Sequence, residues 1–240
     1  MRRLWKPPSR HGTIGRLSSG MEFYCSANVM QQEFPMIIDT DDDTTHRLPR
    51  LKAAGVTTVI RYLARGHTWK TVSVGEAKAL AAAGIKLGLV FETTGKPHGS
   101  AEGAADGEWA VRGAREAGAP QGAVIWYAVD YDPSPSDMAE VENAFRAFRQ
   151  KVKAAGYRVG AYASGYCNGI LKSKGMIDMR WLTQSLGFSG TRTAIKTKDY
   201  ELLQLLPKTV AGLDADPDRP LTADGDIGDF LPFAPAPGEA

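Results

Sequence analysis

The stretch "LAAAGIKLGLVFE" (residues 80–92) joins an alanine-rich helix end, a glycine and a β-rich apolar run. Glycine suits the left-handed backbone conformation that ends many helices. The apolar run is typical of a strand buried on both faces of a parallel sheet. The same order recurs in "LKAAGVTTVIRYL" (51–63), "EAGAPQGAVIWYAVD" (116–130) and "VKAAGYRVGAYAS" (152–164). We therefore predict successive strand–helix units with a glycine at each helix end: Gly55, Gly84, Gly118 and Gly156.

Helices are predicted between these strands. Asp43 can cap a helix in "TTHRLPRLKAAG" (44–55), and Ser73 with Glu76 forms a capping box in "SVGEAKALAAAG" (73–84). The stretch 134–156 begins with acidic and ends with basic residues, which is the order that the helix dipole favours.

Eight strands are predicted, beginning at "FPMIIDT" (34–40). The last three are "MRWLTQSL" (179–186), "YELLQLL" (200–206) and "GDIGDFL" (225–231), and no clear helical pattern separates them. This order favours an α/β fold, an irregular TIM-type barrel with about five helices, over a dinucleotide-binding sheet, whose G-x-G-x-x-G motif follows no strand. We expect residues 1–33 to form an N-terminal extension, 34–232 the barrel domain and 233–240 a disordered tail.

Composition narrows the class of protein. Hydrophobic residues make up 43% of the 240 residues and the formal net charge is +2, so a soluble globular protein is expected and nucleic acid is not. No apolar run approaches the ~20 residues of a membrane span, and no standard signal peptide is visible. The four histidines are dispersed and match no metal site, so we expect no metal and no cofactor. Cys25 and Cys167 either form one bridge or stay free.

Polar residues close the predicted strands, at the end of the barrel where active sites gather. They are Asp39, Arg61, Tyr62, Glu92, Asp130, Asp132, Tyr162, Gln184, Gln204 and Asp226. Asp130 and Asp132 share a strand face with Trp126, so we expect both acids to look into the barrel mouth. Glycosidic hydrolysis needs one carboxyl group held protonated and another ionised, and neighbouring acids separate their pKa values. Aromatic rings near these strands, including Trp181, suit the apolar faces of sugars.

Structural alternatives stay open for several of these residues. Asp130 is either a site residue or a structural acid paired with Arg61, and Asp132 before Pro133 is equally typical of a turn. Gln184 and Gln204 either contact a ligand or bond to each other inside the barrel. The acidic run at 39–43 lacks the glycine and glutamate of a calcium loop.

These segments together resemble the glycoside-hydrolase-like domain family, formerly a domain of unknown function and related to the lysozymes of glycoside hydrolase family 25. The resemblance covers residues 34–232 and includes "IIDTDDDTT", "VIWYAVDYD", "GYRVGAYAS" and "RWLTQS". It implies an irregular eight-stranded barrel that cleaves the β-1,4 link between muramic acid and glucosamine in peptidoglycan. It also implies a partner that is a polysaccharide and an action at the cell wall, after secretion or phage release. We expect a monomer.

Matching positions give the residues roles. Asp39 takes the acid of strand one, Asp130 the first acid of the strand-four D-x-E motif, and Asp226 the acid of strand eight. Asp132 stands where family 25 has the catalytic Glu, one methylene longer, and Glu92 is the other candidate proton donor. Substrate contacts are expected from Arg61, Tyr62, Tyr162, Gln184, Gln204 and Trp181. The alternative function is an inactive saccharide-binding barrel. A barrel enzyme for small metabolites is disfavoured, because residues 208–220 are acidic where a phosphate-gripping glycine loop would stand.

Overall fold

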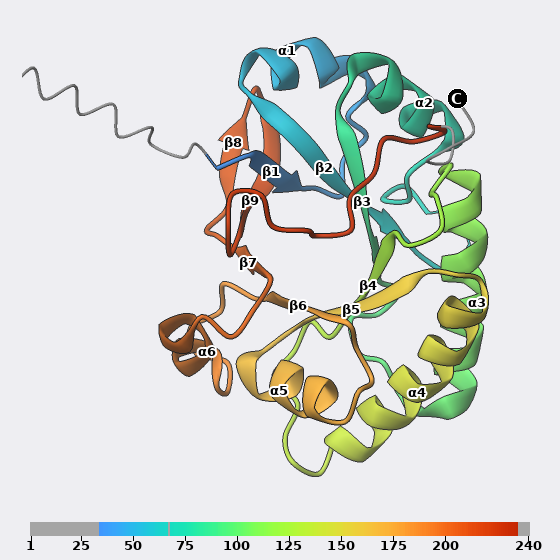
Figure 1. The fold of residues 1–240 in the computed structure, drawn as a ribbon, viewed down its shortest axis with the longest axis vertical. Helices are drawn as coiled ribbons and strands as arrows, with labels where there is room; N and C mark the ends of the chain where they lie inside the picture. Colours follow the sequence, from blue (N-terminus) through green and yellow to red (C-terminus); the bar gives the residue numbers. More distant parts are fainter. Residues whose placement is uncertain (1–33, 67, 235–240) are drawn as a thin grey trace, which may run out of the picture. The chain divides into compact units, whose positions relative to one another are not determined.

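Residues 34–66 and 68–234 are described by the computed structural model. In this part of the chain eight strands close into a barrel that six α-helices surround (Figure 1). The barrel strands are β1 Met36–Asp39, β2 Val56–Leu63, β3 Lys86–Phe91, β4 Val124–Ala128, β5 Arg158–Ala163, β6 Met179–Leu182, β7 Leu202–Gln204 and β9 Leu213–Pro220. The predicted irregular TIM-type barrel is confirmed. The predicted extension 1–33 and residues 235–240 of the predicted tail lie outside the described residues.

Strands β1 to β7 run parallel to one another, and β9 closes the ring in the opposite direction. It pairs antiparallel with β7 on one side and β1 on the other. The short strand β8 (Lys208–Val210) forms a hairpin with β9. A regular TIM barrel has eight parallel strands, so the antiparallel closing strand is a departure from that pattern.

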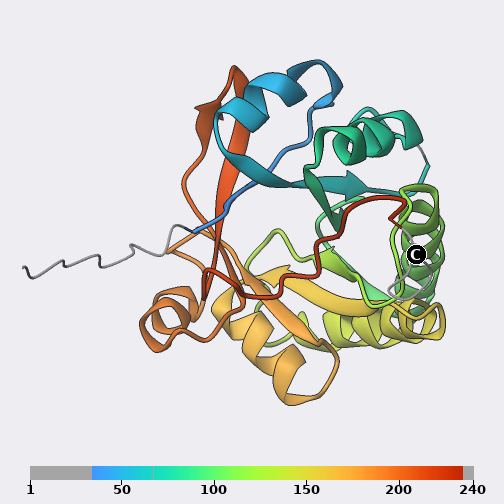
Figure 2. The same ribbon diagram turned by 45° about the horizontal axis from the view of Figure 1, so that its top comes forward.

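The predicted eighth strand at 225–231 is therefore wrong. Residues in this range cross the amino-terminal end of the barrel, where Phe230 and Leu87 exchange backbone hydrogen bonds of 2.8 and 3.0 Å. Figures 1 and 2 show this late segment in red, running across the barrel. Strand β9 is not predicted from the sequence because "LDADPDRP" is polar and contains two prolines, whose nitrogens cannot donate hydrogen bonds within a sheet.

Helices lie on the outside of the barrel, between consecutive strands (Figure 2). They are α1 Leu48–Ala53, preceded by a 3-10 turn at Thr45–Arg47, then α2 Val74–Ala83, α3 Gly99–Glu116, α4 Met138–Ala154, α5 Gly165–Ser173 and α6 Thr191–Thr197. The predicted glycines end their helices or precede their strands with φ of 85°, 69°, 69° and 86°. Helix α6 was not predicted, and none of the described helices combines the length and apolarity of a membrane span.

Apolar side chains fill the interior of the barrel. Trp126 and Trp181 meet edge to face inside it, with ring centroids 5.8 Å apart. Trp126 fits because Gly160 has no side chain: a Cβ there would lie 2.1 Å from the indole. A second, larger apolar layer packs between the strands and the helices. This pair of indoles fills the barrel interior beneath the carboxyl ends of the strands.

Candidate active site

A hollow of about 220 Å³ opens at the carboxyl ends of the strands. Seven of the predicted site residues line it: Tyr62, Glu92, Asp130, Tyr162, Trp181, Gln184 and Gln204. They come from β2 to β7 and the residues just after them, so barrel closure brings together positions that are up to 142 residues apart. Asp216 of β9, which we did not predict, also lines the hollow.

A side-chain network forms the floor. The Gln204 amide nitrogen donates to Asp39 Oδ2 and to Asp216 Oδ2, each at 3.1 Å. The Gln204 carbonyl accepts from the Tyr162 hydroxyl at 2.8 Å, and the Tyr62 hydroxyl lies 3.4 Å from Asp39 Oδ1. Gln204 therefore fixes the positions of two carboxyl groups at once.

The acids at the floor of the hollow have no cationic partner among the described residues. Burial raises the pKa of Asp39 to about 7, and the carboxylate of Asp216 adds to this rise. Burial also raises the pKa of Asp218 well above its usual range, with Asp39 adding to the shift. No Lys, Arg or His forms an ion pair with Asp39, Asp216 or Asp218 among the described residues. Burial and mutual repulsion therefore both favour the protonated forms of these carboxyls, and no cation among the described residues opposes them.

Asp218 lies deepest in this group. Its Oδ1 accepts a 2.8 Å hydrogen bond from the Trp181 indole, while its Oδ2 is buried without a hydrogen-bond partner among the described residues. Burial likewise raises the pKa of the half-buried Asp216. The signal for both acids was present in the sequence, as acids two residues apart in "LDADPDRP", but the prolines made this stretch typical of a loop.

The rim of the hollow is more exposed. Asp130 follows β4, and its backbone nitrogen donates to Gly95 O at 2.8 Å. Gly95 comes so close that a Cβ there would lie 3.0 Å from Asp130 Cβ. Glu92 is paired with Lys70 at 2.7 Å, and the Lys70 ammonium also lies 5.0 Å from the centre of the Tyr62 ring. The rim thus offers one solvated carboxylate, Asp130, and one carboxylate already held by a cation.

Asp132 does not share the strand face of Asp130. Strand β4 ends at Ala128, so alternation does not continue to residue 132. Asp132 instead accepts hydrogen bonds from the Ser189 backbone nitrogen, at 3.0 Å to each oxygen, and from its hydroxyl, at 2.8 Å. It anchors the loop after β6 and does not line the hollow.

Arg61 also lies away from the hollow. It is fully buried on the outer face of β2, where its guanidinium bonds to Glu76 of α2 at 2.8 and 3.2 Å. Thr44 donates to the same carboxylate. The expected substrate contact and the alternative pairing with Asp130 are both corrected, because alternation along β2 points Tyr62, and not Arg61, inward. The Glu76 nitrogen still donates to Ser73 Oγ, as the capping box predicts.

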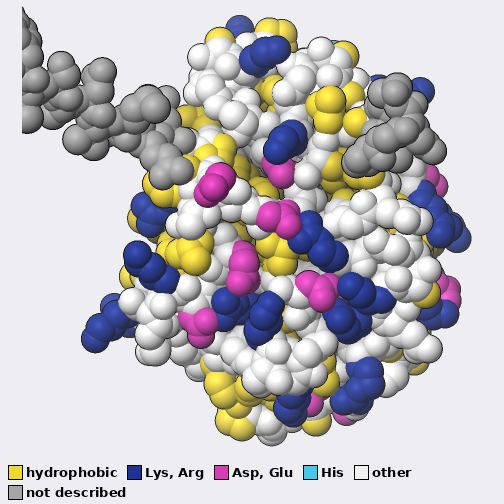
Figure 3. Space-filling view, viewed as in Figure 1, with side chains coloured by type: hydrophobic (Ala, Val, Ile, Leu, Met, Phe, Trp, Pro, Cys, Tyr) yellow, Lys and Arg dark blue, Asp and Glu magenta, His cyan; other side chains and the backbone are white. Residues whose placement is uncertain are grey.

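Asp226 lies at the other end of the barrel. Its carboxylate pairs with Arg158, at the start of β5, at 2.5 and 3.0 Å, and this pair lowers its pKa. Figure 3, which views the molecule from the side that the late segment crosses, shows acidic and basic side chains interspersed over its middle. Asp226 therefore does not lie at the barrel mouth, because the segment predicted as the eighth strand crosses the opposite end of the barrel.

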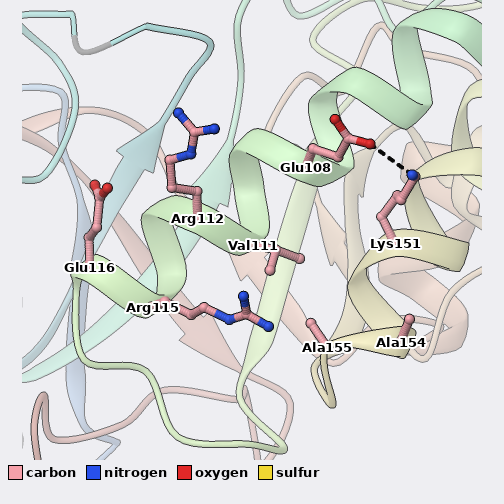
Figure 4. Close-up of a pocket in the computed structure, with 8 residues that line it drawn as sticks. All are labelled: Glu108, Val111, Arg112, Arg115, Glu116, Lys151, Ala154 and Ala155. Carbon is pink, nitrogen blue, oxygen red and sulfur yellow. Dashed lines mark hydrogen bonds and ion pairs between the residues drawn. The ribbon is translucent and has the colours of Figure 1, made fainter.

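A larger hollow, of about 480 Å³, lies elsewhere. It is a groove between α3 and α4, where Lys151 pairs with Glu108 at 2.7 Å (Figure 4). It faces outward from the helix layer and holds none of the predicted site residues. The smaller hollow at the barrel mouth, with its buried acids and amide, is the better candidate for chemistry.

Comparisons with known proteins agree with this fold. The family described as "Rv2525c-like, glycoside hydrolase-like domain" matches residues 49–204, and the chain belongs to this family. The structure of the Mycobacterium tuberculosis Tat-secreted protein Rv2525c in complex with L-tartrate superposes with a TM-score of 0.69 at 19% identity, over 82% of this chain and 99% of that one. The modular autolysin LytC of Streptococcus pneumoniae, solved with a synthetic peptidoglycan ligand, gives a TM-score of 0.54 at 15% identity, over 77% of this chain and 46% of that one. The predicted family resemblance is confirmed, and these structural likenesses show the fold.

A curated relative is the uncharacterized protein FadG of Bacillus subtilis. It is 29% identical over 165 residues, which are 61% of this chain. The matched part is 27% of FadG, so the chain spans about a quarter of that relative's length.

Proposed function

We propose that this barrel binds bacterial cell-wall peptidoglycan in the mouth hollow and hydrolyses a β-1,4 glycosidic bond. The observation that carries this proposal is the contrast between two carboxyl groups of the same hollow. Asp130 is exposed to solvent, whereas Asp216 is half-buried with a raised pKa. Two carboxyl groups in unlike environments are what glycosidic hydrolysis needs.

In this proposal Asp216 is the proton donor. Burial raises its pKa and so favours the protonated form that can donate to the leaving oxygen of the sugar, and the Gln204 amide fixes its position. Asp130, exposed at the rim, stabilises positive charge on the sugar or activates the attacking water. Glu92 is the poorer candidate, because its carboxylate is already engaged in an ion pair with Lys70 at 2.7 Å. Tyr62 and Tyr162 present rings and hydroxyls to the saccharide.

A second candidate is saccharide binding without cleavage. It is favoured by the position of Asp132, since the residue in place of the family 25 Glu is held by Ser189 and not aimed into the hollow. A binding protein needs only the aromatic and amide contacts of the hollow, which are complete without that acid.

The test is release of reducing ends from purified peptidoglycan. We expect Asp130→Asn and Asp216→Asn each to lower the release by at least ~100-fold, as loss of an acid or base does. Asp132→Asn should keep most of the activity, because its amide can still accept from Ser189. Calorimetry with muropeptides separates the candidates: binding without any release supports the second, and no binding rejects both. A large loss in Asp132→Asn alone would return the donor role to Asp132.

We further propose that the protein acts outside the cytoplasmic membrane, at the cell wall. The substrate lies there, and Rv2525c, which shares the fold, is described as Tat-secreted. Detection of the protein in culture filtrate or wall fractions tests this placement.

A further inference from the structure

An apolar groove of about 430 Å³ adjoins the acidic hollow. It lies between the loop that follows β6 and the segment that follows β7. Its apolar residues are Leu186, Ile195, Leu203, Leu205 and Leu206. Leu206 is 74% exposed and Leu186 46% exposed.

The groove contrasts with the hollow in chemistry. Its lining includes no charged residue, whereas the hollow has three carboxyl groups. Covering these leucines removes apolar surface from water, so an aliphatic group gains from lying in the groove. The groove is also without aromatic side chains, which are the usual platforms for sugar rings. Its chemistry therefore suits an aliphatic substituent better than a second sugar.

Size and continuity indicate that one ligand occupies both. Small-molecule sites usually measure ~300–1,000 Å³, and the hollow alone, at about 220 Å³, is smaller than that. Gln184, Ser185 and Gln204 line both the hollow and the groove. A ligand seated over Gln204 can therefore extend into the groove without leaving the protein surface.

The wall of the groove is anchored before any ligand arrives. Asp132 holds Ser189, and the Ser189 carbonyl accepts from the Tyr166 backbone nitrogen at 2.8 Å. The Arg192 guanidinium donates to Leu186 O at 3.0 Å, which fixes the backbone of the exposed leucine. Such preorganisation reduces the entropy lost when a ligand binds.

We propose that this groove is a second subsite, which takes the short, alanine-containing peptide stem joined to the saccharide in the hollow. This inference rests on the proposed function and adds what the substrate must carry: a small aliphatic segment next to the sugar. Alanine methyl groups match the leucine surface, and the side chains of Gln184 and Ser185 can bond to the peptide backbone between the two subsites.

The test compares two ligands that share one saccharide. Calorimetry measures binding of a muropeptide disaccharide with its tripeptide stem and of the same disaccharide without the stem. We expect the wild-type chain to bind the stem-bearing form about 10-fold more tightly. Leu206→Ser and Leu186→Ser should each lower that preference to about 2-fold or less and leave binding of the bare disaccharide unchanged. Leu231→Ser, a leucine 40% exposed beside Phe230 at the other end of the barrel, is the matched control and should keep the preference.

Each outcome supports or overturns the subsite. Equal wild-type affinity for the two ligands overturns it and leaves the proposed function standing. Failure of both ligands to bind rejects the proposed function itself. If sedimentation shows a wild-type dimer that Leu206→Ser dissociates, the groove is an interface between two copies of the chain, and the peptide subsite is overturned. Circular dichroism of each variant confirms that the fold is retained.

Discussion

Asp39 is a carboxyl group buried at 3% exposure beside two further acids, with hydrogen bonds from Gln204 and Tyr62 in partial compensation. Arg61 and Glu76, equally buried between β2 and α2, compensate each other as an ion pair. Burial therefore raises the pKa of Asp39, which has no cation beside it, whereas Arg61 and Glu76 bind each other directly. The interior acids remain titratable groups, and the outer pair is a fixed structural contact.

Stability should fall as pH rises through neutrality. The pKa of Asp39 is raised in the folded state to about 7, so between its unfolded value near 4 and pH 7 the folded state binds more protons than the unfolded state. The protonated form thus contributes stability that is present below pH ~4 and lost by pH ~8. We expect the free energy of unfolding, measured in urea, to drop by on the order of 2 kcal/mol from pH ~5 to pH ~8. Asp39→Asn should flatten this dependence, and an unchanged slope in that variant would contradict the assignment.

Helices α3 and α4 approach each other through glycine. A Cβ at Gly103 would lie 2.1 Å from the Ala144 carbonyl oxygen, so the backbone contact of the two helices requires a residue without a side chain. Gly169 in α5 is also helical, but a Cβ there would meet nothing within 4 Å. The two glycines occupy the same kind of element and differ in what faces them.

Alanine should therefore have opposite effects at the two glycines. Gly103→Ala overpacks the helix contact and should lower the free energy of unfolding by about 1–3 kcal/mol. Gly169→Ala should raise it by about 0.5–1 kcal/mol, because alanine restricts the unfolded chain and favours the helix. Urea denaturation of both variants gives the comparison. A loss of stability in Gly169→Ala, or none in Gly103→Ala, would show that the helix contact is arranged differently.

The two ends of the barrel carry different residues. The carboxyl end of the barrel holds the hollow and its acids, and the amino-terminal end is crossed by the segment that carries Asp226. Asp216 and Asp226, ten residues apart in sequence, stand at these two ends because β9 runs antiparallel and returns the chain to the bottom of the barrel.

Replacing Asp226 and replacing Asp216 should have different effects on hydrolysis and on the free energy of unfolding. Asp226→Asn weakens a largely exposed ion pair with Arg158 and should cost below about 1 kcal/mol in unfolding, with peptidoglycan hydrolysis and muropeptide binding unchanged. Asp216→Asn, the same chemical change at the mouth, should abolish hydrolysis. Reducing-end release and urea denaturation on both variants measure the two effects. Equal loss of activity in the two would refute the division of the barrel into a functional and a structural end.

The sequence alone determined the first seven strands, the helices with clear caps and the class of barrel. It could do so because the glycine at Gly84, the cap at Ser73 and the apolar run 85–91 are local signals, each decided by neighbours a few residues away. For the same reason Tyr62, Glu92, Asp130 and Gln204 could be predicted to meet, since parallel strands bring their carboxyl ends to one edge.

Only the tertiary structure decided which face Arg61 occupies, that Asp132 holds Ser189, and that Asp216, and not Asp226, lies at the mouth. These depend on strand direction, on where β4 stops and on a closing strand whose prolines are untypical of a sheet. Contacts between distant segments set all three, and those contacts lower the free energy only once the ring is closed.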